Sequence, residues 1–184
     1  MEVLLHACCA VCSVECVRAL QEEGLSLRLF WYNPNIHPWT EYKARRDSLL
    51  AFAGEQGIEV LRRDEYGLRP FLTALGPPPP PAPPERCALC YRLRLNLTAS
   101  LAAKEGFAAF STTLLISPYQ NHELIKELAR EAAREHGTSF LYRDFRPRYA
   151  AGQRAARERG YYRQKYCGCL FSEEERYLKS PAKN

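Results

Sequence analysis

The sequence predicts an α/β fold, a single domain with a five-stranded, mainly parallel sheet flanked by helices and followed by a C-terminal helical segment. Short apolar segments alternate with longer segments of helical periodicity, and this alternation is typical of parallel sheets. The length of 184 residues suits one domain with one sizeable core. Hydrophobic residues make up 46% and charged residues 26%, as in globular proteins.

The elements follow from apolar runs and from the breakers between them. A strand at 3–6 leads into a helix at 12–23, which ends near Gly24. A strand at 25–32 precedes the Asn33-Pro34-Asn35 turn and a charged helix at 40–56, which ends at Gly57. A short strand at 58–62 and a helix at 87–105 come next. A strand at 107–112 is followed by a helix that Pro118 opens and that runs to 136. A fifth strand at 139–142 and a helix at 152–159 complete the pattern.

The segment 76–84 (GPPPPPAPP) is the one low-complexity stretch of the chain. A run of this kind is typical of a stiff polyproline spacer. No internal repeat and no second domain are visible in the sequence. We therefore expect residues 1–184 to form one α/β domain, with 76–84 as a proline-rich loop within it.

Charge and N-terminal sequence limit the environment and the partners. The formal charge of +5 and a pI of about 8.8 permit a polyanionic partner without requiring one. No apolar run approaches the ~20 residues of a membrane helix. The first residues, MEVLLH, lack the basic and long apolar regions of a signal peptide. The expectation is a cytoplasmic protein with no membrane association.

The eight cysteines are clustered, with four at positions 8, 9, 12 and 16, two at 87 and 90, and two at 167 and 169. Without an export signal, such clustering indicates metal ligation rather than disulfides. Thiolates select zinc, copper(I) or iron–sulfur clusters. Cys16, one helical turn after Cys12, is expected to be buried and inert. The remaining seven exceed the four that a structural zinc needs, so a cluster with a second metal, or two metals, is expected.

Polar residues follow the expected strands, at the sheet edge where α/β proteins bind ligands. Asn35 and His37 follow the second strand, Tyr119 opens a helix, and Asp144 and Arg146 follow the fifth strand. For His37 a structural or substrate-binding role competes with ligation or proton donation. Asp144 could be a hard ligand or an acid and Arg146 could hold a phosphate, and a plain ion pair between them competes with both roles. Aromatic and basic side chains alternate before the last cysteines and suit base stacking and phosphate contact, or else a solvated helix face. These are Tyr161, Tyr162, Arg163 and Lys165.

Six segments together resemble the QueH-type epoxyqueuosine reductases. They are LLHACCAVCS at 4–13, YNPNIHPWTEY at 32–42, RCALCYRLRL at 86–95, STTLLISPYQNHELI at 111–125, RDFRPRY at 143–149 and YYRQKYCGCLFS at 161–172. The segments span nearly the whole chain in the expected order. The chain departs from the pattern at Val11, where a proline is common and would stiffen the cysteine turn.

The resemblance implies an adenine nucleotide hydrolase-like fold and a cobalamin-independent reduction of epoxyqueuosine to queuosine at the wobble position of tRNA. It implies a [4Fe-4S] cluster, an additional mononuclear metal ion (iron or zinc), and an external low-potential electron donor of the ferredoxin or flavodoxin type. The implied metal ligands are Cys8, Cys9, Cys12, Cys87, Cys90, Cys167 and Cys169, with Asp144 as a further candidate.

Roles in the reaction are hypotheses on the same residues. The proton donor is expected among His37, Asp144 and Tyr119. The tRNA anticodon loop is expected to contact six residues, through its phosphates and its splayed bases. These are Asn35, Arg146, Tyr161, Tyr162, Arg163 and Lys165.

Three alternatives remain open from the residues alone. A zinc-binding RNA-interaction protein without redox chemistry would be colourless. An ATP-dependent tRNA-modifying enzyme would need a Gly/Ser-rich phosphate loop after the first strand, where this chain has ACCAVCS without a glycine. A dithiol oxidoreductase acting through Cys87 and Cys90 would survive the loss of Cys167 and Cys169.

Overall fold

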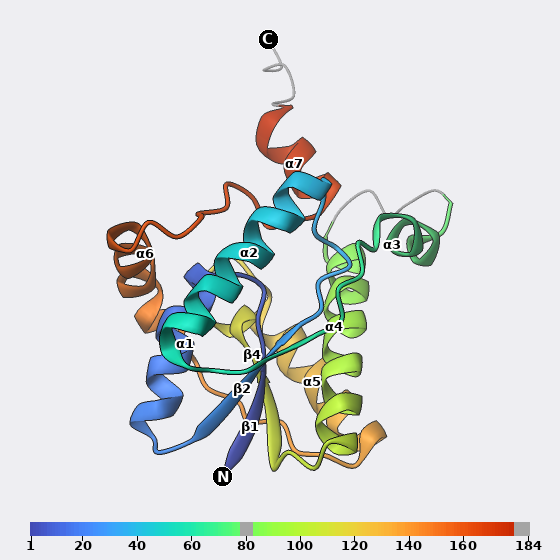
Figure 1. Ribbon diagram of the computed structural model, residues 1–184. Coiled ribbons are helices and arrows are strands. Elements are labelled where there is room, and N and C mark those ends of the chain that lie inside the picture. The colour runs from blue at the N-terminus through green and yellow to red at the C-terminus, as the bar shows by residue number, and fades with distance from the viewer. Residues whose placement is uncertain (78–82, 179–184) are drawn as a thin grey trace.

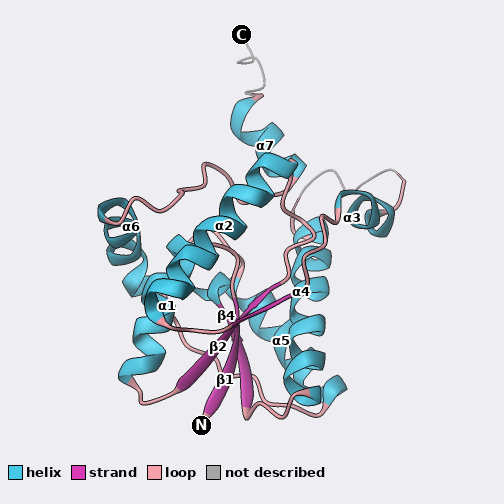
Figure 2. Cartoon of the chain, in the orientation of Figure 1, coloured by secondary structure: helices cyan, strands magenta, loops and turns pink. Residues whose placement is uncertain are grey.

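A four-stranded parallel sheet lies at the centre of the computed structural model, which describes residues 1–77 and 83–178 (Figure 1). The strands are β1 (Glu2–His6), β2 (Ser26–Trp31), β3 (Val60–Arg62) and β4 (Ala109–Thr112), in the order β3-β2-β1-β4. Helices cover both faces of this sheet (Figure 2). The predicted α/β class with a helix-flanked parallel sheet is confirmed.

The first strand occupies an inner position. It pairs with β2 from Glu2↔Ser26 to His6↔Phe30, and with β4 from Val3↔Ala109 to His6↔Thr112. From Val3 to His6 every side chain is buried. A continuous apolar run is typical of a strand covered on both faces. The turn that follows β1, where the first cysteines lie, therefore opens at the middle of the sheet edge.

The predicted fifth strand at 139–142 is wrong. Among the described residues, this segment makes a single parallel bridge between Phe110 and Phe140. The Phe110 amide donates to the Ser139 carbonyl (2.9 Å), and the Leu141 amide donates to the Phe110 carbonyl (2.8 Å). Only a few residues separate Gly137 from the charged pair at 143–144, so the apolar stretch is too short and too exposed to extend the ladder.

Two groups of helices form the outer layers (Figure 1). On one side lie α1 (Ala10–Glu22), α2 (Trp39–Gln56) and α6 (Tyr149–Glu158); on the other lie α4 (Glu85–Lys104) and α5 (His122–His136). Of the described helices, none is long and apolar enough to cross a membrane. The sequence predicted all five, with α5 beginning four residues later than expected because Asn121, not Pro118, caps it: the Asn121 Oδ1 accepts from the Leu124 amide at 3.1 Å.

Four shorter elements connect these layers. They are α3 (Leu68–Leu75), the 3₁₀ turns η1 (Thr113–Ile116) and η2 (Arg146–Arg148), and α7 (Leu170–Tyr177). The last is the expected C-terminal helical segment. The proline-rich loop predicted at 76–84 lies largely outside the described residues, and α4 begins directly after Pro84.

Candidate metal centre

Three cysteines at the β1–α1 turn, Cys8, Cys9 and Cys12, have sulfur atoms that all lie within 4.8 Å of one another. We call them the first thiol group. The turn brings them together because Cys9 is the N-cap of α1, where its Sγ accepts from the Cys12 amide at 3.4 Å. All three are buried. Three convergent soft donors can bind a metal ion.

Hydrogen bonds within the first thiol group favour ionisation of one thiol, that of Cys8. Hydrogen bonds from Cys12 and then Cys9 hold the pKa of Cys8 well below its usual value, whereas the hydrogen bond to Cys8 raises the pKa of Cys12 well above it. The Thr113 hydroxyl lies 3.5 Å from the Cys8 sulfur on the other side. Metal binding would release the protons that remain, because only thiolates ligate.

The second thiol group combines Cys87 and Cys90 of α4 with Cys167 and Cys169, which lie just before α7. The charges of the last two influence both α4 thiols, so the four lie in one region of the structure. Burial raises the pKa of Cys90 to about 12. Within the described chain, only the first thiol group brings three candidate ligands within 4.8 Å. Cys16 joins neither group and is fully buried in α1, as predicted.

The Cys167-Gly168-Cys169 loop is fastened to α2 by a buried arginine. Arg45 donates to the Cys167 carbonyl (2.8 Å) and to the Tyr166 carbonyl (2.9 Å), and it is ion-paired with Glu41 at 2.6 Å. Gly168 has a φ of +137°, and a Cβ there would lie 3.2 Å from the Arg45 guanidinium and from Ile36. A glycine at this position lets the backbone of the loop approach α2 closely.

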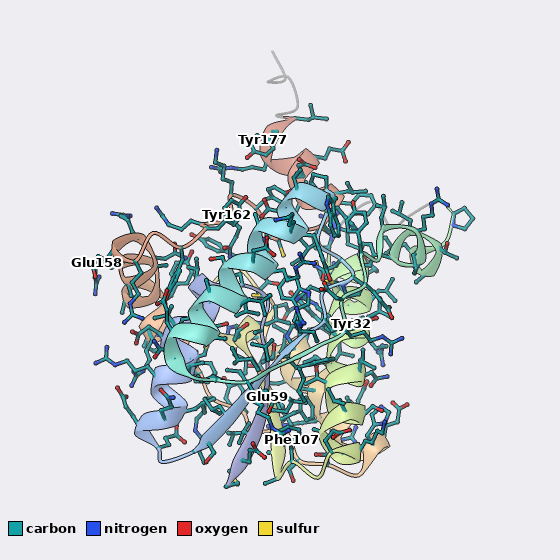
Figure 3. The ribbon with its side chains drawn as sticks, in the orientation of Figure 1. Tyr32, Glu59, Phe107, Glu158, Tyr162 and Tyr177 are labelled. Carbon is teal, nitrogen blue, oxygen red and sulfur yellow. The ribbon has the colours of Figure 1, made fainter. Side chains whose placement is uncertain are left out.

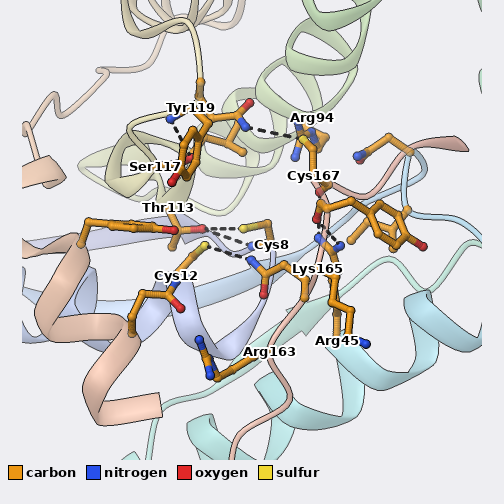
Figure 4. Close-up of a pocket in the computed structure, with 18 residues that line it drawn as sticks. Cys8, Cys12, Arg45, Arg94, Thr113, Ser117, Tyr119, Arg163, Lys165 and Cys167 are labelled. Carbon is orange, nitrogen blue, oxygen red and sulfur yellow. Dashed lines mark hydrogen bonds between the residues drawn. The ribbon is translucent and has the colours of Figure 1, made fainter. Parts of the chain in front are cut away.

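A cavity of about 390 Å³ joins the two thiol groups (Figure 4). Cys8 and Cys12 line it from one side and Cys167 from the other. Among the described residues its lining contains four cations and no carboxylate. The cations are Arg45, Arg94, Arg163 and Lys165. This chamber is of a size that holds a small organic ligand and is electrostatically suited to anions.

Comparison with known proteins identifies the family. The family model described as "Epoxyqueuosine reductase QueH" matches residues 3–175. The chain belongs to this family. An epoxyqueuosine reductase QueH of Dehalococcoides mccartyi is 37% identical over 98% of both chains, and one of Thermotoga maritima is 36% identical over 95% of this chain and 91% of its own. The chain is thus an oxidoreductase, and the resemblance seen in the sequence is confirmed.

A solved structure also matches the fold. The structure described as a predicted subunit of tRNA methyltransferase from Methanocaldococcus jannaschii aligns with a TM-score of 0.50, covering 88% of this chain and 90% of that one. The two sequences are 14% identical, so the likeness concerns the fold alone. It agrees with the adenine nucleotide hydrolase-like architecture expected of QueH proteins.

Four of the residues expected to act on the QueH substrate line the cavity: Asn35, Tyr119, Arg163 and Lys165. Asn35 is buried, and its Oδ1 has no hydrogen-bond partner among the described atoms. Tyr119 is 81% exposed and contacts Tyr149 edge-on at the rim. These positions suit contact with a bound ligand.

Three other expected residues lie away from the cavity lining. His37 is fully buried against the rings of Tyr66 and Phe71, each 5.6 Å away, and burial lowers its pKa to about 4. Asp144 accepts from Arg146 at 2.8 and 2.6 Å, and this pairing lowers the Asp144 pKa to about 2. The ion pair is half-exposed at the surface.

The two tyrosines expected to stack on bases are attached to α2. Tyr161 is buried, packs edge-on against Phe52 and donates to Glu55. Tyr162 is 37% exposed, and its hydroxyl donates to Glu41 (Figure 3). Their contacts hold the 161–166 segment along α2, beside the cavity mouth.

Sequence reasoning missed three residues that contact the thiols. Arg94 Nη2 donates to the Cys90 sulfur at 3.0 Å, Gln120 donates to Cys167 at 3.5 Å, and Gln164 donates to Cys12 at 3.7 Å. Arg94 follows Cys90 by one helical turn, a spacing that places both on one face and could have identified it. The two glutamines carried no such signal.

Proposed function

We propose that this chain reduces epoxyqueuosine to queuosine at the wobble position of tRNA. The reaction takes two electrons and two protons, breaks both C–O bonds of the epoxide, forms an alkene and releases water. The observation that carries the proposal is the convergence of both thiol groups on one carboxylate-free cavity in a QueH-family oxidoreductase.

The donor set fits a sulfur-ligated metal centre. The seven thiols of the two groups would hold a [4Fe-4S] cluster and an additional mononuclear metal ion, iron or zinc, with Asp144 as a further ligand if it leaves Arg146. Soft thiolates at a buried site, with a buried arginine that has no carboxylate partner among the described residues, suit an anionic iron–sulfur centre. Once bound, the cluster would supply electrons one at a time, and the additional ion would act as a Lewis acid toward the epoxide oxygen.

The cavity residues would bind the base and deliver protons. Tyr119 is the first candidate for the proton donor, because it lines the cavity at an exposed position. His37 and Asp144 remain candidates that would have to reach the cavity from outside its lining. Asn35 offers a buried amide with an unpaired oxygen to a substrate hydroxyl or amine.

The tRNA would bind along α6 and the segment that follows it. Several arginines elsewhere on the surface are ion-paired, as in Arg28–Glu2, Arg143–Glu23 and Arg92–Glu131. Five basic residues between 154 and 165 have no carboxylate partner among the described residues, and the last two enter the cavity lining. They are Arg154, Arg157, Arg159, Arg163 and Lys165. Unpaired cations leading into a pocket suit the phosphates of an anticodon loop whose target base enters the cavity.

Residues Tyr162 and Arg146 complete the proposed tRNA contacts. Tyr162 keeps a partly exposed ring for base stacking, whereas Tyr161 would need to leave its packing against Phe52. Arg146 would exchange Asp144 for a phosphate. The electrons would come from a low-potential protein donor of the ferredoxin or flavodoxin type, in the cytoplasm.

The proposal is tested on protein purified without oxygen. Iron and sulfide analysis should find both elements, and the protein, reduced chemically or by a ferredoxin, should convert epoxyqueuosine-containing tRNA to queuosine-containing tRNA. Mass spectrometry of the released nucleosides measures the loss of one oxygen atom. Colourless protein that holds zinc alone and leaves the epoxide intact would refute the proposal.

A further inference from the structure

Arg94 is a buried cation that faces sulfur instead of carboxylate. Its side chain is 2% exposed, on the inner face of α4. The Nη2 atom donates to the Cys90 sulfur at 3.0 Å, and the Nε atom donates to the Cys90 carbonyl at 3.1 Å. No Asp or Glu forms an ion pair with it anywhere in the described chain. It also lines the cavity beside Cys8 and Cys167.

Two other buried arginines of the structure show what is unusual about Arg94. Arg45 is 1% exposed and is paired with Glu41, and Arg86 is 4% exposed and is paired with Glu175. A buried charge without a counter-charge is strongly unfavourable, so proteins rarely keep one. Arg94 must therefore be balanced by an anion other than a carboxylate.

The atoms around Arg94 identify that anion as ligated sulfur. Its Nη2 atom donates to the Cys90 sulfur, and Cys167 and Cys8 line the same cavity as its guanidinium. These three cysteines come from three separate segments and from both thiol groups. The guanidinium donates to Cys90 of the second group and lines the same cavity as Cys8 of the first. The two neutral amide donors, Gln120 and Gln164, each contact one thiol of one group.

We propose that Arg94 is the counter-ion of the metal centre and sets its reduction potential. The inference rests on the proposed function, because it requires a redox centre at these thiols. Reduction adds one negative charge to the centre, and a fixed positive charge in a dry site stabilises the reduced form more than the oxidised form. Removing the charge lowers the reduction potential, so that electron transfer from the donor becomes less favourable.

The test compares three variants of the full chain, loaded with iron and sulfide without oxygen. Arg94→Gln removes the charge, Arg94→Lys keeps it, and Arg92→Gln is the matched control. Arg92 lies two residues earlier on the same helix, with its side chain 54% exposed in a pair with Glu131. The readout is the midpoint potential, from a redox titration followed by electron paramagnetic resonance, together with the iron and sulfide content.

We expect Arg94→Gln to shift the midpoint potential to a lower value, Arg94→Lys to stay nearer the wild type, and Arg92→Gln to match the wild type. If Arg94→Gln does not retain iron while Arg94→Lys does, the requirement for a positive charge is supported by metal content alone. An unchanged potential in Arg94→Gln would overturn the inference. So would equal loss of iron in both Arg94 variants, because the residue would then act through its shape.

The same experiment separates this inference from the proposed function. Wild-type protein that takes up no iron and sulfide would refute the proposed function and, with it, the role of Arg94 as counter-ion. Wild-type protein with a normal cluster and full conversion of the tRNA base, combined with an unshifted Arg94→Gln potential, would sink the counter-ion alone.

Discussion

The first thiol group lies within five consecutive residues and is wholly buried, whereas the second joins a helix to a loop near the end of α2 and includes the exposed Cys167. The sulfurs of the first group already lie within 4.8 Å of one another. In the second group, the loop that carries Cys167 and Cys169 is held to α2 by Arg45, which donates to the Tyr166 and Cys167 carbonyls.

The two thiol groups therefore differ in what positions their sulfur atoms, which is local backbone geometry in the first and long-range contacts in the second. A turn that caps a helix fixes its thiols through local backbone geometry, so the first group forms once β1 and α1 have packed. A loop held by a buried ion pair depends on the whole fold. We therefore expect the first group to be the rigid half of the site and the second to be the labile half.

The largest effect should come from the rigid half. Cys8→Ser replaces the thiol whose anion is most favoured and which lines the cavity. Loss of a soft ligand should lower bound iron and reduce tRNA conversion by at least about 100-fold, beyond the range typical of outer-shell changes. Metal analysis and nucleoside mass spectrometry check this. Cys16→Ala is the control, because Cys16 is buried outside the group and should keep its iron; full iron in Cys8→Ser would contradict the assignment.

The second prediction concerns Arg45, the residue that holds the loop of the second thiol group to α2. Arg45→Met leaves Glu41 buried beside Tyr162 without its cation, so the free energy of unfolding should fall by about 3–5 kcal/mol. Lys43→Met removes an exposed pair with Asp47 on the same helix and should cost less than about 1 kcal/mol. Urea denaturation measures both values.

The rate of thiol labelling tests whether Arg45 holds the second thiol group and not the first. In metal-free Arg45→Met protein, thiol-reactive reagents should label Cys167 and Cys169 faster than in the wild type, with labelling of Cys8 and Cys9 unchanged. Equal unfolding free energies for the two variants, or equal acceleration at all four cysteines, would show that Arg45 does not clamp the second group.

These two halves also differ in how far the sequence predicts them. The CCAVC turn after an apolar strand places the first group directly, because strand, turn and helix are all local patterns. The glycine between Cys167 and Cys169 is a local signal that fits the close backbone approach of this loop to α2. The burial of Arg45 was not predictable from its place on a charged helix face. Its pair with Glu41 is local, but the carbonyls of Tyr166 and Cys167 that cover it lie far along the chain.

Other differences have the same cause. The apolar segment 139–142 has strand composition, yet its neighbours leave room for one bridge to Phe110. Tyr161 alternates with cations as in a stacking surface, but Phe52 and Glu55 occupy its ring and hydroxyl. In each case tertiary contacts decide among states that the local sequence permits.

A third and smaller effect is expected at the glycine of the labile half. Gly168→Ala forces a side chain into a φ of +137° and toward Arg45 and Ile36, which should cost about 1–3 kcal/mol and reduce bound iron severalfold. Gly160→Ala is the control, since its φ of +69° is also positive but nothing lies within 4 Å of the added Cβ. It should keep its iron despite a loss of about 1–2 kcal/mol. Iron loss of the same size in both variants would show that the close approach is unimportant.

The smallest expected effect concerns the unpaired cations that precede the second group. Arg163→Gln should weaken tRNA binding and reduce the slope of log affinity against log salt by about 1, because one phosphate contact is lost. Arg63→Gln removes an exposed arginine paired with Glu65 and should leave the slope unchanged. Fluorescence anisotropy with labelled tRNA at several salt concentrations measures both. Identical slopes for Arg163→Gln and the wild type would place the RNA elsewhere.

The position of the Cys167-Gly168-Cys169 loop has a consequence for biosynthesis. Ribosomes make the chain from its N-terminus, so β1, α1 and all the sheet strands emerge before this loop exists. A nascent chain halted before Cys167 can offer a metal only the thiols of the β1–α1 turn and of α4. With the proposed ligand set, complete loading would have to wait until translation has passed Cys169.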